Sequence, residues 1–386
     1  MRVLLVHNRY QQAGGEDRVF ERERALLQGA GHEVETYERH NNEIGGRGTA
    51  RTALDAIWSR QSHAEASALI ARFRPDVLHA HNTFPLVSPS VFHAAQTQGV
   101  PVVQTLHNFR LACLNATLLR DGQPCRSCVG RVPWRGVAHG CYQGGIAQSA
   151  VLAASLTLHR IVGTYRSRIR TFIALTPSAR EEFVAAGLPA ERIVVKPNFV
   201  AASPAGAARE RANVLYVGRL SPEKGIATLA EAARLLPDVR FVVAGTGPSE
   251  PDLAGLRNVA LLGQLSHEAV LEQMRSARCL VMPSLWPEGM PMALLEAFSC
   301  GLPVVASDIG SLGEIVEPEH TGLLFQPGDA AGCAARITDL LGDTARWERM
   351  STEARAHAAD RYGPARNLEL LESIYASCLT PEAALP

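Results

Sequence analysis

The chain has 386 residues, 46% of them hydrophobic and 20% charged, and its formal net charge at pH 7 is zero. This composition excludes a disordered polyelectrolyte and offers no general excess of positive charge for nucleic acid. The length exceeds one ordinary hydrophobic core, so two domains are expected. No apolar run reaches bilayer length, and we expect no signal peptide because polar residues follow the first strand at once. The expected compartment is the cytoplasm, where thiols stay reduced unless they bind metal.

The first half of the chain predicts alternating strands and helices, which form an N-terminal domain over residues 1–198. A helix is expected over 17–29, where apolar residues recur on one side. Short apolar runs between turn residues predict the strands of this domain at 2–7, 33–37, 76–80, 100–106, 171–175 and 192–196.

The second half repeats the alternation after a linker at 199–212, which is rich in Ala, Pro and Gly. The C-terminal domain is expected over 213–362, and residues 363–386 are expected to form a C-terminal helix. Its strands are predicted at 213–217, 240–244, 259–262, 279–283, 303–307 and 322–325, and its helices at 225–236, 267–277, 291–300 and 330–341, with a further helical pattern over 344–378. Repeated strand–helix units predict an α/β fold with two Rossmann-like, doubly wound parallel sheets, whose ligands lie beyond the carboxyl ends of the strands.

The segment PSLWPEGMPMALLEAFSCG carries the strongest functional signal. Glu288 precedes Gly289, Met290 and Pro291 in a tight loop, and Glu296 is expected one or two turns inside the helix that follows. Such a loop directs free backbone N–H groups and the positive end of a helix at a ligand. A phosphate held there, with hydroxyls within reach of two carboxylates, matches a nucleotide sugar. The alternative is an ordinary loop and helix with solvent-facing glutamates.

This segment resembles the E-x7-E motif of the retaining glycosyltransferases of family 4. The resemblance implies the GT-B fold, with two Rossmann-like domains facing across a cleft, and a last helix that crosses back to the N-terminal domain. It also implies that Glu288 binds sugar hydroxyls beside the backbone of Gly289, Met290 and Pro291, and that Glu296 binds the ribose.

A second motif, Gly218-Arg219-Leu220-Ser221-Pro222-Glu223-Lys224-Gly225, follows the strand 213–217. The guanidinium fork of Arg219 and the point charge of Lys224 could hold a diphosphate. The motif resembles the family 4 segment that holds the donor diphosphate, so Gly218, Arg219 and Lys224 are predicted to bind the donor. GT-B enzymes usually use no metal, so no cofactor is expected for catalysis and these cations would stabilise the leaving group. A surface turn with solvated charges is the alternative.

Two features of the N-terminal domain complete the predicted site. Gly14 and Gly15 open the first helix, where the backbone can approach a ligand and the helix end attracts anions, and family members have an acceptor and phosphate loop here. His107 ends a strand and resembles the family histidine that contacts the donor sugar, so it is a predicted catalytic residue with Glu288. His81 also ends a strand, although a structural role is favoured for it. Lys196 is the only lysine besides Lys224, and its role stays open.

Four cysteines, Cys113, Cys125, Cys128 and Cys141, have the spacing C-x11-C-x2-C-x12-C within an insert at 110–142. The central pair has metal-knuckle spacing, so we expect a structural zinc ion with these ligands, with unrelated thiols as the alternative. The predicted family subgroup carries this four-cysteine insert in the N-terminal domain. The remaining cysteines, at 279, 300, 333 and 378, are expected in the core.

The predicted function is transfer of a hexosyl unit from a UDP-, GDP- or ADP-linked sugar to a glycan or polyprenyl-linked acceptor, with retention, in cell-surface polysaccharide biosynthesis. Residues 150–170 combine apolar and Arg residues, a pattern that fits a helix resting on anionic lipid and equally a core helix with a solvated end. The family resemblance favours peripheral contact with the inner membrane face, because such enzymes often extend lipid-linked glycans. The alternatives for function are a sugar-nucleotide epimerase of the same fold and a non-catalytic sugar-nucleotide-binding subunit.

Overall fold

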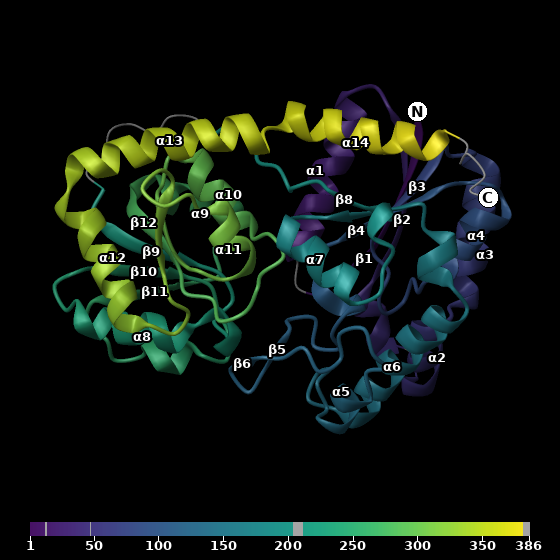
Figure 1. Ribbon diagram of the computed structural model, residues 1–386, viewed down its shortest axis with the longest axis horizontal. Helices are drawn as coiled ribbons and strands as arrows, with labels where there is room; N and C mark the ends of the chain where they lie inside the picture. Colours follow the sequence, from purple (N-terminus) through teal and green to yellow (C-terminus); the bar gives the residue numbers. More distant parts are fainter. Residues whose placement is uncertain (12–13, 47, 204–210, 381–386) are drawn as a thin grey trace. The chain divides into compact units, whose positions relative to one another are not determined.

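The structure, a computed structural model, describes residues 1–11, 14–46, 48–203 and 211–380. Two compact units make up this part of the chain (Figure 1). Unit 1 contains Met1–Leu118, Arg126–Pro197 and the described residues from Asn367 on, and unit 2 contains Leu119–Cys125 and Asn198–Arg366. Each unit has one parallel six-stranded sheet with helices on both sides, as the strand–helix alternation predicted.

The sheet of unit 1 has the strand order β2-β1-β3-β4-β7-β8. Its strands are β1 (Arg2–Arg9), β2 (Glu33–His40), β3 (Val77–Asn82), β4 (Val102–Leu106), β7 (Thr171–Ala174) and β8 (Ile193–Val195). Its helices are α1 (Gly15–Gly29), α2 (Thr49–Ile57), α3 (Arg60–Phe73), α4 (Ser90–Thr97), α5 (Trp134–Ala138), α6 (Ile146–Ile161), α7 (Pro177–Ala185) and α14 (Pro364–Leu379).

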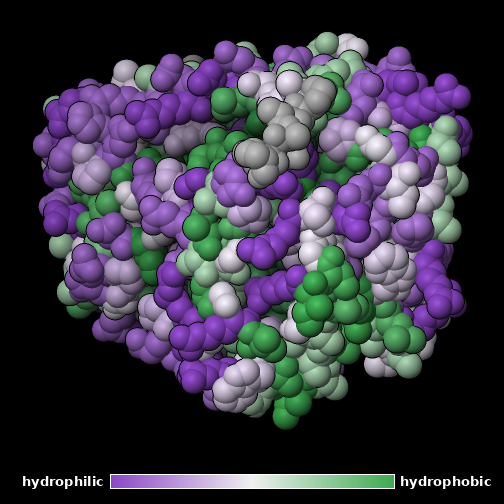
Figure 2. Space-filling view, turned by 45° about the vertical axis from the view of Figure 1, so that its right-hand side comes forward, coloured by the Kyte–Doolittle hydropathy of each residue, from purple (hydrophilic) through white to green (hydrophobic). Residues whose placement is uncertain are grey.

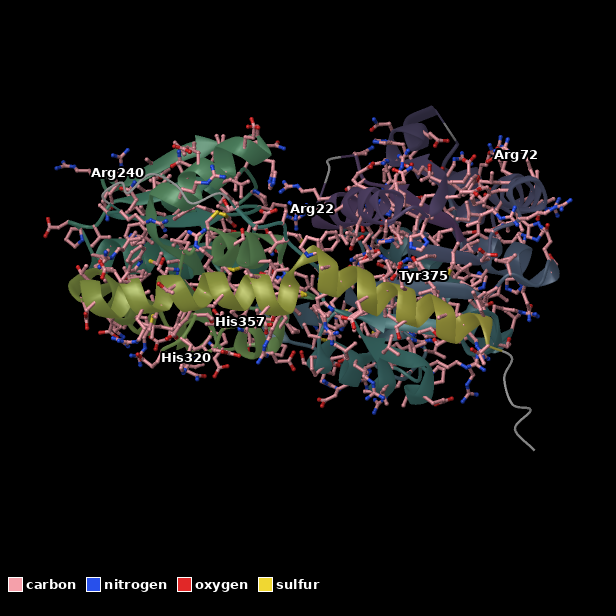
Figure 3. The ribbon with its side chains drawn as sticks, turned by 90° about the horizontal axis from the view of Figure 1, so that it is seen from above. Arg22, Arg72, Arg240, His320, His357 and Tyr375 are labelled. Atoms are coloured by element: carbon pink, nitrogen blue, oxygen red, sulfur yellow. The ribbon has the colours of Figure 1, made fainter. Side chains whose placement is uncertain are left out.

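One core of unit 1 lies between the sheet and helices α1 and α14. Val3 and Leu5 point to the same face of β1 because side chains alternate along a strand, and Phe20 of α1 packs there with them. From α14, Leu371 and Tyr375 enter the same cluster, and the hydroxyl of Tyr375 lies 2.8 Å from Nδ1 of His79 in β3. Figure 3 shows Tyr375 on the yellow α14. A helix from the end of the chain thus completes the core of unit 1.

The sheet of unit 2 has the order β11-β10-β9-β12-β13-β14. Its strands are β9 (Asn213–Val217), β10 (Phe241–Ala244), β11 (Val259–Gly263), β12 (Ala277–Met282), β13 (Val304–Ser307) and β14 (Gly322–Phe325). Its helices are α8 (Ile226–Leu235), α9 (His267–Ser276), α10 (Met292–Ser299), α11 (Gly310–Ile315), α12 (Ala330–Gly342) and α13 (Thr344–Tyr362), and a short hairpin joins β5 (Leu119–Arg120) to β6 (Gln123–Pro124). The four cysteines expected in the two cores are buried.

The predicted strands all occur, with ends that differ by a few residues. The helical pattern over 344–378 contains two helices rather than one, separated at Gly363. Pro364 has no N–H to continue the first helix and forces the preceding residue into an extended conformation, which Gly363 adopts with φ −70° and ψ 153°. Residues 204–210 of the predicted linker and 381–386 of the predicted C-terminal helix lie outside the described residues. Among the described helices, none combines the length and apolarity needed to span a bilayer.

Candidate functional site

In unit 2, the loops that follow the neighbouring strands β9 and β12 lie against each other. The N–H of Leu285 donates to the carbonyl of Glu223 at 2.9 Å. Gly225 also packs closely against the second loop. A Cβ added at this position would stand only 1.8 Å from the carbonyl oxygen of Pro283. Gly225 also has φ +71°, a conformation that glycine adopts without steric cost. The chain therefore needs glycine here to hold the two predicted donor-binding motifs together.

Lys224 and Glu288 are in direct contact across these loops. Nζ of Lys224 lies 2.6 Å from Oε2 of Glu288, and the hydroxyl of Ser284 donates to Oε1 of the same carboxylate. The ammonium group also stands 5.5 Å from the ring centroid of Trp286. Glu288 is buried, whereas the side chain of Lys224 is 23% exposed, so the cation is the more accessible member of the pair.

Arg219 lies on the same turn as Lys224 but faces solvent. Its guanidinium Nη2 donates to Glu223 at 2.6 Å and Nε donates to Ser221 at 3.3 Å, while 67% of the side chain is exposed. Burial opposes ionisation of Glu223, but hydrogen bonds from Ser221 and Arg219 outweigh it and lower the pKa of the carboxyl. Gly218 precedes this turn at the end of β9. The turn thus presents one exposed guanidinium five residues before the ammonium group.

The remaining predicted donor-binding residues lie at the start of α10. Pro291 is the N-cap, and Gly289 and Met290 precede it in the loop, where both are buried. The carbonyl of Met290 accepts a hydrogen bond of 3.2 Å from the side chain of Asn198. Glu296 is buried inside α10, and one of its carboxylate oxygens lies 3.8 Å from Nδ1 of His267. Lys224 and Glu288 are therefore paired, while Arg219 and Glu296 lie on neighbouring elements of the same unit.

In unit 1, the predicted Gly14-Gly15 turn stands at the N-terminus of α1. The N–H of Gly14 donates to Asp17 at 2.7 Å, and the other carboxylate oxygen of Asp17 lies 2.9 Å from Nε2 of His7. Burial opposes ionisation of Asp17, but the hydrogen bond to His7 and the backbone bond outweigh it, so the pKa of Asp17 is lowered. The side chain of Asn108 donates to Glu16 at 2.6 Å. The turn therefore lies beside the segment that follows His107.

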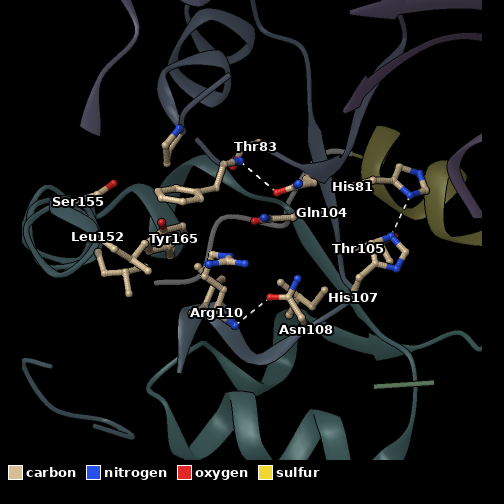
Figure 4. Close-up of a pocket in the computed structure, with 16 residues that line it drawn as sticks. His81, Thr83, Gln104, Thr105, His107, Asn108, Arg110, Leu152, Ser155 and Tyr165 are labelled. Atoms are coloured by element: carbon tan, nitrogen blue, oxygen red, sulfur yellow. Dashed lines mark hydrogen bonds between the residues drawn. The ribbon is translucent and has the colours of Figure 1, made fainter. Parts of the chain in front are cut away.

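His107 is the partly exposed end of a buried series of polar groups. Its Nε2 lies 2.9 Å from Nδ1 of His81 (Figure 4), and Nε2 of His81 lies 3.2 Å from Glu23. The other oxygen of Glu23 accepts a hydrogen bond of 2.5 Å from the ammonium of Lys196. His81, Glu23 and Lys196 are buried, and His107 is partly exposed. Sequence reasoning missed Glu23 and favoured a purely structural role for His81.

The polar and charged groups around His107 determine its protonation state. Burial would raise the pKa of Glu23, but the Lys196 ammonium, followed by the adjacent ring of His81, holds it well below the usual value. Burial lowers the pKa of His107 far below its usual value, with His81 adding to the effect, so the ring is neutral at neutral pH. A lone pair on Nε2 of His81 would face the Glu23 carboxylate 3.2 Å away, although this contact is not aligned as a hydrogen bond, so we assign the His81 proton to Nε2 and the His107 proton to Nε2. Nδ1 of His107 is left with a lone pair.

One group of three potential metal ligands occurs among the described residues, namely Glu23, His79 and His81, whose ligand atoms lie within 4.8 Å of one another. Some of these atoms already have protein partners, whereas Oε2 of Glu23 and Nε2 of His81, which lie 3.2 Å apart, make no aligned hydrogen bond within the described part of the chain. Nδ1 and Nε2 of His79 lie 2.8 Å from the hydroxyls of Tyr375 and Thr105, and the ammonium of Lys196 contacts Glu23. The Lys196 ammonium already compensates the charge of Glu23, so a further cation at this group would face a like charge.

The cysteines of the predicted zinc site fall in both units. Cys113, Cys128 and Cys141 belong to unit 1, and Cys125 belongs to unit 2. Cys128 is buried, and the other three are partly exposed. The zinc ion therefore stays a prediction.

A small cavity of about 60 Å³ lies in unit 1 at the ends of β3 and β4 (Figure 4). Its lining includes His107, Asn108, Gln104 and Arg110, and the guanidinium of Arg110 stands 5.1 Å from the ring centroid of Phe84. Within the described part of the chain, Oε1 of Gln104 and Nη1 of Arg110 are buried without a hydrogen-bond partner. This volume is enough for several water molecules or a polar group of similar size. Sequence reasoning missed both residues, although Arg110 follows His107 closely in the chain.

Comparison with known proteins defines the class of this chain. Residues 14–198 match a family model described as a glycosyl transferase 4-like domain, and residues 203–357 match a model described as glycosyl transferases group 1. Together these matches extend over most of both units. The chain therefore belongs to the family 4 glycosyltransferases, as the motif at Glu288 predicted.

Individual relatives and one solved structure agree with this family. Glycogen synthase of Mycobacterium tuberculosis is 30% identical over 300 residues, which are 73% of this chain and 64% of the relative. The chain thus spans somewhat less than two thirds of that relative. Alpha-maltose-1-phosphate synthase of Mycolicibacterium smegmatis is 28% identical over 86% of this chain and 84% of the relative. HepE of Anabaena, solved with UDP-glucose, has a TM-score of 0.66 at 19% identity, covering 98% of this chain and all of the other, which shows the fold.

Proposed function

We propose that the protein transfers a hexosyl unit from a nucleotide sugar to a glycan or lipid-linked acceptor, with retention of anomeric configuration, in cell-surface polysaccharide biosynthesis. The contact of Lys224 with Glu288, at the carboxyl ends of β9 and β12, is the observation that carries this proposal. It places a cation and a carboxylate side by side where open α/β sheets bind ligands. A nucleotide sugar needs both, because its diphosphate is anionic and its sugar presents hydroxyls.

Each donor-binding residue has a separate role in this proposal. Lys224 and Arg219 hold the diphosphate, and they stabilise the negative charge that grows on it as the sugar departs. Glu288 accepts hydrogen bonds from sugar hydroxyls, and the backbone of Gly289 and Met290 contributes N–H donors. Glu296 accepts hydrogen bonds from the ribose. Members of this family are typically metal-independent, and these cations would take the part that a metal has in other transferases.

His107 is the proposed catalytic residue of unit 1. Because its ring is neutral and its Nδ1 keeps a lone pair, it can accept a hydrogen bond from a hydroxyl without bringing a positive charge to the reacting sugar. The N–H groups at Gly14 and Gly15 are proposed to bind an acceptor or phosphate oxygen, since the start of a helix favours anions. These assignments rest on the family resemblance and on the position of both groups beyond strand ends.

The test begins with donor binding. A ligand that binds only the folded protein stabilises it by about 2.7 kcal/mol at a hundredfold excess over Kd, so thermal shifts with UDP-, GDP- and ADP-sugars would identify the donor. UDP-glucose is the first candidate, because HepE was solved with it. Transfer to acceptor, followed by NMR of the anomeric proton, should then show retention. Inversion would contradict the proposed stereochemistry, and isomerised donor formed without acceptor would identify an epimerase instead.

A further inference from the structure

Helix α6 exposes an unbroken apolar line along its length. Ile146, Ala150, Ala154, Leu158 and Val162 follow one another at intervals of four residues, and all five side chains are exposed. Residues four apart are neighbours on the surface of a helix, so these side chains form a continuous stripe that turns about 40° around the helix at each step. Over the 16 residues of α6, the stripe is about 24 Å long. We call it the α6 face, and it includes the neighbouring Ile161, which is 77% exposed.

The elements that pack against α6 also expose large apolar side chains. Both α2 and α5 contact α6. Leu54 of α2 is 67% exposed, and Trp134 of α5 is 63% exposed. Figure 2 shows hydrophobic side chains gathered in a green patch at the lower part of the view, on the side where α2, α5 and α6 lie in Figure 1. A patch built from three elements is unusual on a soluble surface and indicates a binding partner.

The charge around this patch is positive. Residues 122–180 contain eight Arg and no Asp or Glu. Arg131, Arg135 and Arg166 are exposed, and none of them forms an ion pair with a described residue. Arg126 is already paired with Glu182. The acidic residue of α2, Asp55, is largely buried and lies 3.9 Å from Arg51. Unneutralised guanidinium groups therefore accompany the exposed apolar side chains.

We propose that the α6 face docks on the surface of an anionic phospholipid bilayer, with α6 lying in the plane of the interface. A helix in this position buries its apolar side among the acyl chains while basic groups contact lipid phosphates. Trp134 suits the same interface because its ring has an apolar body and a polar N–H. The described helices include none that spans a membrane, and docking of this kind needs none.

The positive charge favours a bilayer over a second copy of the chain. A symmetric dimer through this face would bring the arginines of both copies together without acidic partners, and like charges at an interface oppose association. An anionic bilayer supplies the missing negative charge and accepts an apolar face of any shape. Docking is independent of glycosyl transfer, so it can be measured on the full chain without donor or acceptor.

The experiment is sedimentation of the purified protein with vesicles of phosphatidylcholine alone or mixed with equal phosphatidylglycerol. The wild type should sediment with the anionic vesicles and should not sediment with the neutral ones. Added salt should weaken binding to the anionic vesicles, because it screens the charges. Arg131→Gln, Arg135→Gln and Arg166→Gln should each lower the partition coefficient roughly fivefold. Ile161→Ser should lower it about tenfold, because the apolar side chain no longer enters the interface.

Two variants serve as matched controls. Arg72→Gln removes an exposed guanidinium in α3, and Leu235→Ser removes a half-exposed leucine in α8. Both should bind like the wild type, and thermal unfolding should show that all variants remain folded. Sedimentation of the wild type with neither vesicle, or equal binding by all variants, would overturn the proposal. So would a wild-type dimer that Ile161→Ser converts to a monomer, because the face would then be a self-association surface.

Discussion

Lys196 and Glu23 form an ion pair of 2.5 Å in which both side chains are fully buried. The pair joins the residue directly after β8 to α1, and Lys196 also donates to Asn367 of α14 at 3.2 Å. Removing one member of such a pair leaves an uncompensated charge in the core, which typically costs about 3–5 kcal/mol. Replacing both members with apolar residues removes both charges, and the cost is then much smaller. The contact can therefore be tested by comparing single and double substitutions.

We predict that Lys196→Met lowers the free energy of unfolding by about 3–5 kcal/mol, measured by urea denaturation. The double variant Lys196→Met/Glu23→Leu should recover most of this loss. Arg72→Met is the matched control, because Arg72 pairs with Glu35 on the surface of the same unit (Figure 3) and should cost less than about 1 kcal/mol. A double variant no more stable than the single one would contradict the account.

A second prediction concerns the pH dependence of stability. Burial lowers the pKa of His79 and His107 well below 6.5, so the unfolded chain takes up protons there while the folded chain does not. Glu23 acts in the same direction at lower pH, because its folded pKa is held well below 4.5. Stability should therefore be greatest above pH 6.5, decline as pH falls below that value, and decline more steeply below 4.5.

The control for this prediction is His107→Asn, which removes one of the titrating rings. The slope of unfolding free energy against pH between 6.5 and 4.5 should be smaller in this variant than in the wild type. Denaturation at a series of pH values measures both slopes. Equal slopes would show that His107 accepts a proton in the folded protein.

The strands were predictable because buried parallel strands are short apolar runs between turn residues. The pairing of Glu23 with Lys196 was not, since the two positions lie 173 residues apart. The sequence nevertheless indicated a buried carboxylate, because Glu23 lies on the same side of α1 as the buried Phe20 and Leu27. A carboxylate on an apolar helix face calls for a buried cation, and the chain has only two lysines.

Two turns are also encoded by local residues. The residues Gly363-Pro364 favour the break between α13 and α14. The residues Asp121-Gly122 favour the tight turn between β5 and β6. Both turn residues of the hairpin have positive φ, 52° and 73°, as a type I′ turn requires. The site in unit 2 was more accessible to sequence analysis, since Lys224 and Glu288 each belong to a compact motif. Their direct contact depends on β9 and β12 being neighbours in the sheet, which no local pattern encodes.

A third prediction tests the approach of the two loops. Gly225→Ala would put a Cβ 1.8 Å from the carbonyl oxygen of Pro283, so the loops must separate and donor affinity should fall at least about tenfold. Gly255→Ala is the matched control, because Gly255 also has positive φ, +80°, but an added Cβ there meets nothing within 4 Å. Calorimetric titration with the nucleotide sugar measures both, and equal affinities would contradict the role of Gly225.

A fourth prediction concerns the cysteine insert. We expect purified protein to contain about one equivalent of zinc, lost in the variant Cys125→Ser/Cys128→Ser. Cys333→Ser serves as the control, because Cys333 is buried in the core of unit 2 and should leave the zinc content unchanged. Elemental analysis gives the result directly, and zinc well below one equivalent in the wild type would refute the site.

The last prediction tests Lys224 and Glu288. Lys224→Met removes the charge proposed to stabilise the departing diphosphate, so kcat/KM should fall by about 10²–10³. Lys224→Arg should recover only part of the loss, because a planar guanidinium cannot reproduce the point charge 2.6 Å from Glu288. Glu288→Gln should lower kcat/KM as well, since a neutral amide accepts hydrogen bonds from sugar hydroxyls more weakly than a carboxylate.

The matched control is Arg234→Met on α8, which removes an exposed cation paired with Glu231 and should leave transfer unchanged. Steady-state kinetics with the donor found by thermal shift, together with the unfolding temperature of each variant, separate lost catalysis from lost stability. Because Glu288 is buried, Lys224→Met also leaves a carboxylate without its cation, and some loss of stability is expected. If Lys224→Met remained folded and transferred sugar at the wild-type rate, the Lys224–Glu288 contact would be structural and the donor would bind elsewhere.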